Sequence, residues 1–507
     1  MYEVVIGRSE SDRRELGLTG TIFLGKLYVK MGAVTSLSNN VFMDVARAHI
    51  VLVCGKRGTG KCLTGDTLIS LGDGSLVPIQ ELKDSKEGVL GLDNKLKIKP
   101  LDKSEFFERE VEEILYVRLR SGKEIKLTPE HPLLTIKGWK QVKELNIGSR
   151  IATPRVLGNF GSEQMDLDEV KILAYLIAEG YMKKAVLFSN GDKELLDEFR
   201  KAMNGFDEKL YVVKDKKDHY RVVQKDYRTR VIAFEEKERE ENGSFKKGAR
   251  NNTLYEKRSI RKLLERQGLF GTGSLQRFVP PEVMKLRKEL LSLFLNRLFS
   301  CDGSIYKTKG HWEVSYSSSS RRLIRDVQHL LLRFGVLSKL RKKKINCEGK
   351  QFDSEELVVA GKNVENYVKE IGFFGEKRKK QEKCLREIVG IVRNPNVDTV
   401  PQEIWDLYKP KSWAEIGRAA GYAHPKSMRE RVNYAPSRGT LLQIAVADSN
   451  KGLQTLAESD IFWDEIVEIK LIEEKTKVYD ISVPEHHNFV ANDIIVHNSY
   501  TLGVSLV

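Results

Sequence analysis

A glycine-rich segment near residue 60 stops one residue short of a phosphate-binding motif. Residues 55–61 read Gly-Lys-Arg-Gly-Thr-Gly-Lys, and the pattern G-x-x-x-x-G-K-[ST] requires a hydroxyl next, where the chain has Cys62. The hydroxyl occurs at Ser499, directly after His497 and Asn498. Removal of the intervening segment would complete the motif. The boundary residues offer suitable chemistry, because a cysteine thiol is a strong nucleophile and an asparagine side chain can attack its own carbonyl carbon.

Two further motifs lie between these boundaries. Thr128-Pro129-Glu130-His131 resembles the T-x-x-H block of the Hint (Hedgehog/intein) family, and residues 478–490 resemble its closing block. A cysteine at one boundary, His-Asn at the other and a motif healed across them resemble an intein, an element that excises itself from a host protein. The resemblance implies protein splicing across Lys61 and Ser499, with no cofactor.

The resemblance also implies a role for each residue of the splicing site. Cys62 attacks the Lys61 carbonyl, and Ser499 accepts the acyl group before Asn498 cyclises and cuts the chain. Because every step is intramolecular, fixed geometry supplies much of the rate. The assisting residues are Thr128, which holds the scissile peptide, His131, which protonates the leaving nitrogen, Asp480, which manages the Cys62 thiol, His487, which assists acyl transfer and cyclisation, and His497, which polarises the Asn498 carbonyl.

Two apolar segments end in an acidic residue followed by glycine. Residues 172–180 and 295–303 resemble the paired helices of LAGLIDADG (DOD-type) homing endonucleases. The resemblance implies that Glu179 and Asp302 hold Mg²⁺ at the floor of a DNA-binding saddle, with Arg277 as the nearest cation. It implies cleavage of double-stranded DNA by a monomer with two pseudo-symmetric halves. The predicted phosphate contacts are Lys339, Arg341, Lys342 and Lys343.

A shorter segment resembles a helix-turn-helix. Residues 412–422 predict a helix and a glycine turn, and residues 426–432 predict a second helix that would enter the major groove. A purely structural helical hairpin is the alternative. The predicted DNA contacts are Lys426, Arg429 and Arg431.

The healed loop would bind ATP and Mg²⁺ in the spliced host. Its backbone amides around Gly55, Gly58 and Gly60 would cradle the phosphates, Lys61 would reach the outer phosphates, and Ser499 would ligand the metal. The residues before the loop resemble the barrel of HerA-type DNA-translocating ATPases. Only eight residues follow Ser499, so we expect the chain to carry a fragment of the host.

These motifs require a multidomain architecture. We expect an all-β Hint domain split by an α+β two-repeat endonuclease and a small helical segment, after a β-rich host segment. The expected boundaries are 1–61 for the N-terminal host segment, 62–160 and 461–498 for the two halves of the Hint domain, 166–395 for the endonuclease, 396–445 for the helix-turn-helix segment and 499–507 for the C-terminal host fragment.

Composition agrees with a nucleic-acid partner. The net charge is +15, which favours a polyanion, although a charge-rich thermophilic surface is the alternative reading. Five cysteines without metal-type spacing argue against a disulfide framework or a zinc site. With no apolar run long enough for a membrane span, we expect a cytoplasmic protein. Two rival functions stay open: a DNA-cutting or DNA-binding protein with inactive splicing parts, and an ATPase with a decorative insertion.

Overall fold

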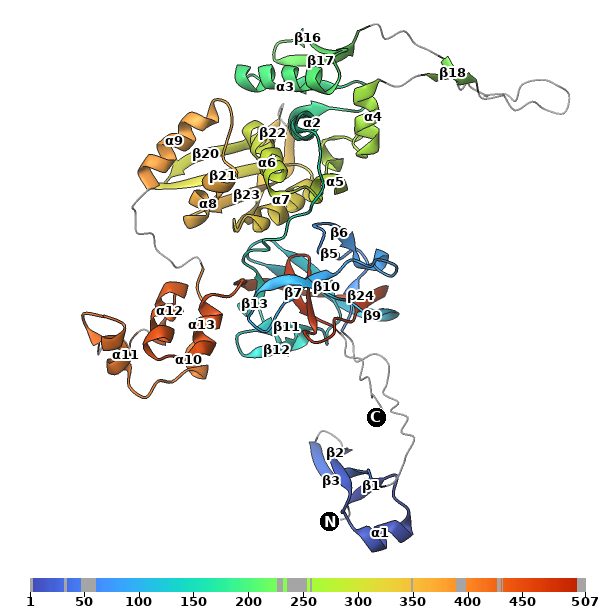
Figure 1. Ribbon diagram of the computed structural model, residues 1–507, viewed down its shortest axis with the longest axis vertical. Coiled ribbons are helices and arrows are strands. Elements are labelled where there is room, and N and C mark those ends of the chain that lie inside the picture. Colours follow the sequence, from blue (N-terminus) through green and yellow to red (C-terminus); the bar gives the residue numbers. More distant parts are fainter. Residues whose placement is uncertain are drawn as a thin grey trace, which may run out of the picture. The chain divides into compact units, whose positions relative to one another are not determined.

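The computed structural model divides into two compact units, Met1–Thr59 and Gly60–Val507 (Figure 1). The structure describes residues 3–31, 34–46, 61–225, 231–234, 253–255, 258–347, 350–388, 398–425, 430 and 432–498. Several predicted site residues lie outside these ranges: Gly55, Gly58, Gly60, Lys426, Arg429, Arg431 and Ser499.

The N-terminal unit is a small sheet with one helix. Its elements are β1 (Val4–Ile6), α1 (Glu10–Leu16), β2 (Thr21–Met31) and β3 (Val34–Asp44), and the strand order is β1-β3-β2. The sequence predicted strands here, and α1 is the difference. Ser9 explains the helix, because its side chain accepts a hydrogen bond from the Asp12 backbone N–H and so caps the first turn.

Strands from both ends of the second unit form one all-β body. One sheet has the order β13-β24-β4-β10-β9 and another the order β12-β11-β26-β25-β5-β6, while β7 and β8 form a hairpin. The long β24 pairs with β9, although the whole insert separates them in sequence. The elements are β4 (Leu63–Thr64), β5 (Leu68–Ser70), β6 (Leu76–Pro78), η1 (Ile79–Glu81), β7 (Val89–Leu92), β8 (Ile98–Leu101), β9 (Phe106–Leu119), β10 (Glu124–Leu127), β11 (Pro132–Thr135), β12 (Gly138–Gln141), η2 (Val142–Glu144), β13 (Arg150–Pro154), β24 (Ile461–Ile481), β25 (Asn488–Ala491) and β26 (Ile494–His497).

The insert repeats one helix-and-sheet pattern. In each copy a helix leads into two strands, a second helix and two more strands, and the sheets have matching orders, β14-β15-β17-β16 and β20-β21-β23-β22. The first copy is α2 (Leu167–Glu179), β14 (Gly180–Tyr181), β15 (Leu187–Ser189), α3 (Lys193–Phe206), β16 (Leu210–Lys216) and β17 (His219–Gln224). The second is α6 (Lys288–Asp302), β20 (Gly303–Thr308), β21 (His311–Ser318), α7 (Arg321–Arg333), β22 (Lys339–Cys347) and β23 (Lys350–Ala360). The remaining elements are β18 (Val231–Phe234), β19 (Thr253–Tyr255), α4 (Ser259–Arg266), η3 (Ser274–Gln276), α5 (Pro281–Met284), α8 (Lys362–Glu370) and α9 (Lys377–Ile388).

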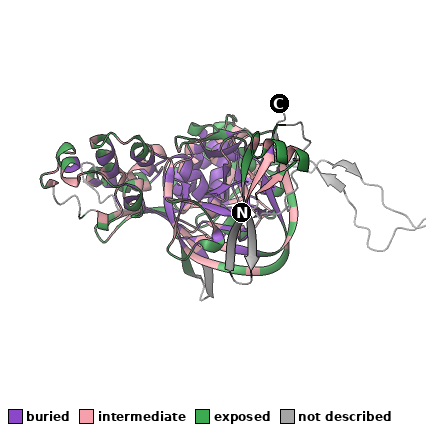
Figure 2. Ribbon diagram, turned by 90° about the horizontal axis from the view of Figure 1, so that it is seen from below, coloured by how far each residue is buried: buried purple, intermediate pink, exposed green. Residues whose placement is uncertain are grey.

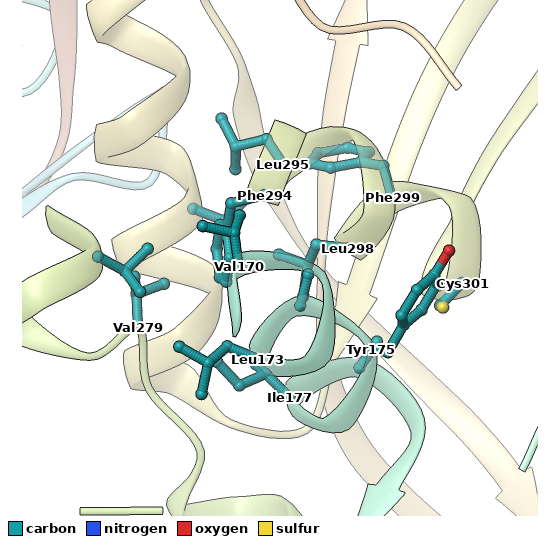
Figure 3. Packing of buried hydrophobic residues seen from close by; sticks show 14 of the residues in the cluster. Val170, Leu173, Tyr175, Ile177, Val279, Phe294, Leu295, Leu298, Phe299 and Cys301 are labelled. Carbon is teal, nitrogen blue, oxygen red and sulfur yellow. The ribbon is translucent and has the colours of Figure 1, made fainter. Parts of the chain in front are cut away.

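The leading helices α2 and α6 pack against each other inside one apolar cluster. Figure 3 shows Leu173 and Ile177 of α2 and Leu298 of α6 within it, all fully buried. Arg297 of α6 leaves this contact, as its size requires, and makes two hydrogen bonds of 2.6 and 2.7 Å to the Glu198 carboxylate. Burial of apolar surface on this scale makes the helix pair a rigid support for whatever its ends carry.

A helical segment joins the insert to β24. It contains α10 (Ile404–Leu407), α11 (Trp413–Ala419), α12 (Arg438–Ala447) and α13 (Lys451–Ala457). The predicted end at residue 445 is therefore too early. The helices continue because Leu453 and Leu456 of α13 are buried in a cluster shared with Trp463 of β24. Figure 2 shows the buried residues of the molecule in purple. None of the described helices combines the length and apolarity that a bilayer crossing requires.

Candidate splicing site and paired-carboxylate site

Strand register places Thr128 against the upstream junction. Leu127 of β10 pairs with Leu63 of β4, so the next position brings Thr128 opposite Cys62. The Cys62 backbone N–H, which belongs to the Lys61–Cys62 peptide bond, donates to Thr128 Oγ1 at 3.0 Å. The Thr128 N–H donates in return to the Cys62 carbonyl at 3.0 Å. The nitrogen of the Lys61–Cys62 peptide is therefore held at a fixed position in a buried site.

The Cys62 thiol is buried between groups of opposite charge. Burial, and then the negative charge of Asp480, raise the pKa of Cys62 to about 11, although Arg109 opposes both effects. Arg109 Nε donates to Cys62 Sγ at 3.3 Å. The thiol is thus protonated at neutral pH, and attack requires a group that takes its proton. Asp480, fully buried on β24, is the carboxylate near enough to influence that thiol.

A second register brings the two junctions together. Leu133 of β11 pairs with Val496 of β26 in antiparallel fashion, and two positions further along the same register His131 faces Asn498. His131 is fully buried, and burial, then the charges of His497 and Lys61, lower its pKa to about 3. Its ring lies beside the Cys62 backbone, but neither nitrogen completes a hydrogen bond of ordinary geometry within the described residues. The upstream and downstream junctions, far apart in sequence, therefore meet at one histidine.

The downstream junction is held by its own histidines. His497 Nδ1 lies 2.6 Å from the Asn498 carbonyl oxygen, and since a carbonyl only accepts, the imidazole is the donor. Burial lowers the pKa of His497 to about 4, so it donates as a neutral ring. The Asn498 N–H donates to the His487 carbonyl at 3.1 Å, and the two histidine rings lie nearly parallel, 6.4 Å apart. The edge of Trp139 packs against the His497 ring. This arrangement can stabilise negative charge that develops on the Asn498 carbonyl oxygen.

The insert carries a second chemical site where α2 and α6 end. Burial and the Asp302 charge raise the pKa of Glu179 to about 7, and burial raises that of Asp302 to about 6. The Asp302 charge acts on Glu179, so the two carboxylates lie close enough to interact. Asn190 Nδ2 donates to Glu179 at 2.7 Å, and a cavity of about 380 Å³ opens beside it. A divalent cation suits two such oxygen ligands, because its charge would relieve their repulsion and Mg²⁺ needs few protein ligands.

A matched pair of cations caps the two helices. Arg277 donates to the carbonyls of Ile177, at 2.6 Å, and of Ala178 and Gly180 at the end of α2. Lys377 donates to the carbonyls of Ser300 and Cys301, both at 2.6 Å, at the end of α6. Each cation thus occupies the C-terminal end of one helix, where the helix dipole is negative. The sequence reasoning found Arg277 but missed Lys377, which begins a helix in a lysine-rich run.

The predicted DNA contacts of β22 divide between two faces. Lys339, Arg341 and Lys343 are exposed and share one face, since side chains alternate along a strand. Lys342 is also exposed, but it lies on the other face with Leu340, which packs against the apolar core. Lys343 bonds Glu356 on β23 at 2.8 Å. Alternation therefore leaves three of the four cations on the sheet face away from the helices.

Among the described residues, no cluster of three or more His, Cys, Asp or Glu side chains forms a ready metal site. Cys62, Cys301 and Cys384 are not joined in disulfides. Apart from Lys377, the sequence reasoning also missed Arg109 at the upstream thiol. Its signal was weak: a single arginine within the run of charged residues that forms β9.

A nucleophile and an asparagine brought together inside an all-β body define a domain that acts on its own backbone. The chain is similar to several known proteins. A family model described as the intein splicing domain matches residues 69–498. The replicative DNA helicase DnaB of Synechocystis sp. is 30% identical over 468 residues, covering 88% of this chain and 50% of that protein. The replication factor C small subunit of Methanocaldococcus jannaschii is 29% identical over 373 residues, covering 69% of this chain and 18% of that protein. A solved DnaB intein from Synechocystis sp. PCC 6803 shares 34% identity, covers 18% of this chain and 69% of that one, and has a TM-score of 0.18.

This chain belongs to the intein splicing-domain family, because the family model matches most of its length. The Hint fold and autocatalytic protein splicing, both expected from the sequence, are confirmed at this level. The chain spans about half the length of the DnaB relatives that it matches.

Proposed function

We propose that splicing proceeds from Cys62 to Asn498 through the two junctions described above. The observation that carries this proposal is the single buried site in which Thr128 holds the Cys62 N–H and His497 holds the Asn498 carbonyl. Cys62 Sγ attacks the Lys61 carbonyl carbon and passes its proton toward Asp480. The peptide nitrogen leaves as the Cys62 amine, a thioester results, and His131, a neutral ring at rest, passes to the nitrogen a proton that it takes up during the step, so that overall the thiol proton is replaced on the amine.

The downstream half of the reaction uses the second histidine pair. The Ser499 hydroxyl takes the acyl group from Cys62, which forms an ester and frees the thiol. Asn498 Nδ2 then attacks its own carbonyl carbon, closing a succinimide and releasing the Ser499 amine, while His497 stabilises the oxyanion and His487 assists. The acyl group finally moves from the Ser499 oxygen to that amine, and an ordinary peptide bond joins Lys61 to Ser499.

Intact mass spectrometry of the expressed chain tests this proposal. The expected products are a fragment of residues 62–498 and a ligated product of 1–61 with 499–507. In Asn498→Ala, C-terminal cleavage stops, while a thiol reagent still cleaves the Lys61–Cys62 bond. Normal ligated product from this variant would refute the mechanism. A persistent full-length mass under all conditions would favour the rival with inactive splicing parts.

We infer a second activity, site-specific cleavage of double-stranded DNA, from the repeated α/β insert. Its support is the internal symmetry: two matching sheets, two packed helices, and Glu179 and Asp302 at corresponding helix ends, each helix capped by a cation. This is the arrangement that the resemblance to LAGLIDADG enzymes leads one to expect. Glu179 and Asp302 would hold Mg²⁺, which when bound activates water and stabilises charge on the leaving oxygen. Lys339, Arg341 and Lys343 would bind phosphates.

DNA that encodes the uninterrupted host junction is the natural substrate to test. We expect the chain to cut it in the presence of Mg²⁺, and the double variant Glu179→Gln with Asp302→Asn to lose cutting while it splices normally. These substitutions keep side-chain size and hydrogen bonding but remove both charges. Retained cutting by the double variant would show that the metal ligands lie elsewhere.

The host identity is a further proposal. The restored loop from Gly55 to Ser499 would bind ATP and Mg²⁺, as the P-loop pattern implies. The matched relatives include proteins named as a DNA helicase and a replication factor, which is consistent with a nucleotide-binding host. Nucleotide binding by the spliced product joined to its complete host, and its absence in the unspliced chain, would support the assignment.

A further inference from the structure

Helix α7 of the insert packs polar side chains against the all-β body described above, which we call the splicing body. Gln328, His329 and Arg333 are each at most 4% exposed. Gln328 Nε2 donates to the Ser121 carbonyl of the β9–β10 turn at 3.1 Å, and Arg333 donates to the Gly74 carbonyl of the β5–β6 turn. Buried polar groups are costly unless they are paired, so this interface is specific in its geometry.

His329 and Arg333 form a hydrogen-bonded relay with Asp493 of the splicing body. Arg333 Nη2 lies 3.0 Å from His329 Nε2, and His329 Nδ1 lies 2.7 Å from Asp493 Oδ1. A guanidinium only donates, so Nε2 must accept, and the ring proton therefore sits on Nδ1 and is donated to the Asp493 carboxylate. Burial lowers the pKa of His329, which agrees with a neutral ring between a cation and an anion. The nearby Lys123 adds a second positive charge beside Asp493.

Asp493 lies in the turn that precedes the last strand of the splicing body. With Asn492 it forms the two-residue turn between β25 and β26, and both residues have left-handed backbones, with φ of 46° and 56°. Asn492 is tied to the splicing body itself, since its Oδ1 accepts from the Leu68 N–H at 2.8 Å. Asp493 is tied to the insert. The turn leads directly into β26, which ends at His497 and delivers Asn498 to the downstream junction.

We propose that the Arg333–His329–Asp493 relay positions the C-terminal splice junction, so that a helix of the inserted domain contributes to the splicing reaction. His329 and Arg333 are positioning residues, because they contact no reacting atom. A strand moves along its axis when its turn moves, and β26 carries such a shift to the Asn498 carbonyl and its hydrogen bond to His497. Cyclisation depends directly on that alignment, whereas the Lys61–Cys62 peptide of the upstream step is held by Thr128, which lies outside β26.

The test measures the two cleavages separately in the full chain. In a Cys62→Ala background, release of residues 499–507 reports cyclisation alone. In the native background, thiol-induced cleavage reports the upstream step. We expect His329→Ala to slow release of residues 499–507 by about tenfold, since a misplacement of about 1 Å costs up to about a hundredfold in rate. Upstream cleavage should stay unchanged. His329→Asn should restore part of the rate, because its amide can donate to Asp493.

A matched control lies at the same interface. Lys285 of the insert bonds Asp73 of the β5–β6 turn at 2.8 Å, away from β26. Lys285→Ala removes a cross-domain contact of comparable kind and should leave both cleavages unchanged. Release within twofold of the parent in His329→Ala, or equal slowing in Lys285→Ala, would overturn the proposal. If His329→Ala does not fold by circular dichroism, Asp493→Asn decides, with slower release at unchanged upstream cleavage expected and equal slowing of both steps refuting.

Discussion

Replacement of His497 by alanine tests the downstream half of the splicing site most directly. The substitution removes the Nδ1–H donor that lies 2.6 Å from the Asn498 carbonyl oxygen. Negative charge develops on this oxygen as the asparagine nitrogen attacks. The imidazole is only 4% exposed and its pKa is lowered to about 4, so it acts as a fixed neutral donor at neutral pH.

Loss of one preorganised oxyanion donor typically costs about 10²–10³ in rate, or about 2.7–4 kcal/mol. We expect the lower value here, because alanine opens space beside Trp139 into which water can enter and donate. The rate of cyclisation should therefore fall by about 10²-fold. The parent rate should also lack an inflection near the ordinary histidine pKa of about 6.5, since the His497 pKa lies well below that value.

Release of residues 499–507 from purified Cys62→Ala protein, followed by mass spectrometry, isolates this step. His486→Ala is a matched control, because His486 belongs to the same segment, and within the described residues its ring makes no hydrogen bond to the junction. Cyclisation within a few fold of the parent in His497→Ala would refute the assignment of His497 as the oxyanion donor. Equal slowing by His486→Ala would show a general loss of structure.

Two further outcomes are expected. Thr128→Val removes the acceptor of the Cys62 N–H, and because one positioning contact is lost, thiol-induced upstream cleavage should slow at least about tenfold. Thr128→Ser keeps the hydroxyl and should retain most of the rate. Equal rates in both variants would contradict the role of the hydroxyl. Arg297→Met leaves the partly buried Glu198 without its cation, with the Tyr175 hydroxyl as its remaining hydrogen-bond donor, and should lower the free energy of unfolding at pH 7 by about 3 kcal/mol. Burial raises the pKa of Glu198, but the hydrogen bonds and charge of Arg297 outweigh burial and hold that pKa below its usual value. The stability that the ion pair contributes is therefore lost as the pH falls through this lowered pKa. Denaturant titrations should show that the difference in stability between variant and parent shrinks in acid.

Individual elements show why some features were predictable and others were not. The expectation of a β-rich host segment agrees with β2 and β3, and the acid-glycine endings predicted where α2 and α6 stop, since local pattern determines both. Helix α1 was missed because the whole host segment was expected to be β-rich, whereas Ser9 caps a helix in the polar residues that follow it. The helices after residue 445 were missed because their burial against Trp463 depends on a strand that follows them in sequence.

The sequence by itself identified the candidate splicing residues of this protein. Cys62, the T-x-x-H block and His497-Asn498 are reactive residue types in a fixed order along the chain. They can be recognised from residue type and order, without any knowledge of the distances between them. Only the tertiary structure decided which residues meet. The register of β11 with β26 brings His131 to Asn498, the packing of α2 on α6 brings Glu179 near Asp302, and docking of α7 brings His329 to Asp493. Such pairings depend on contacts between segments hundreds of residues apart, which local sequence does not encode.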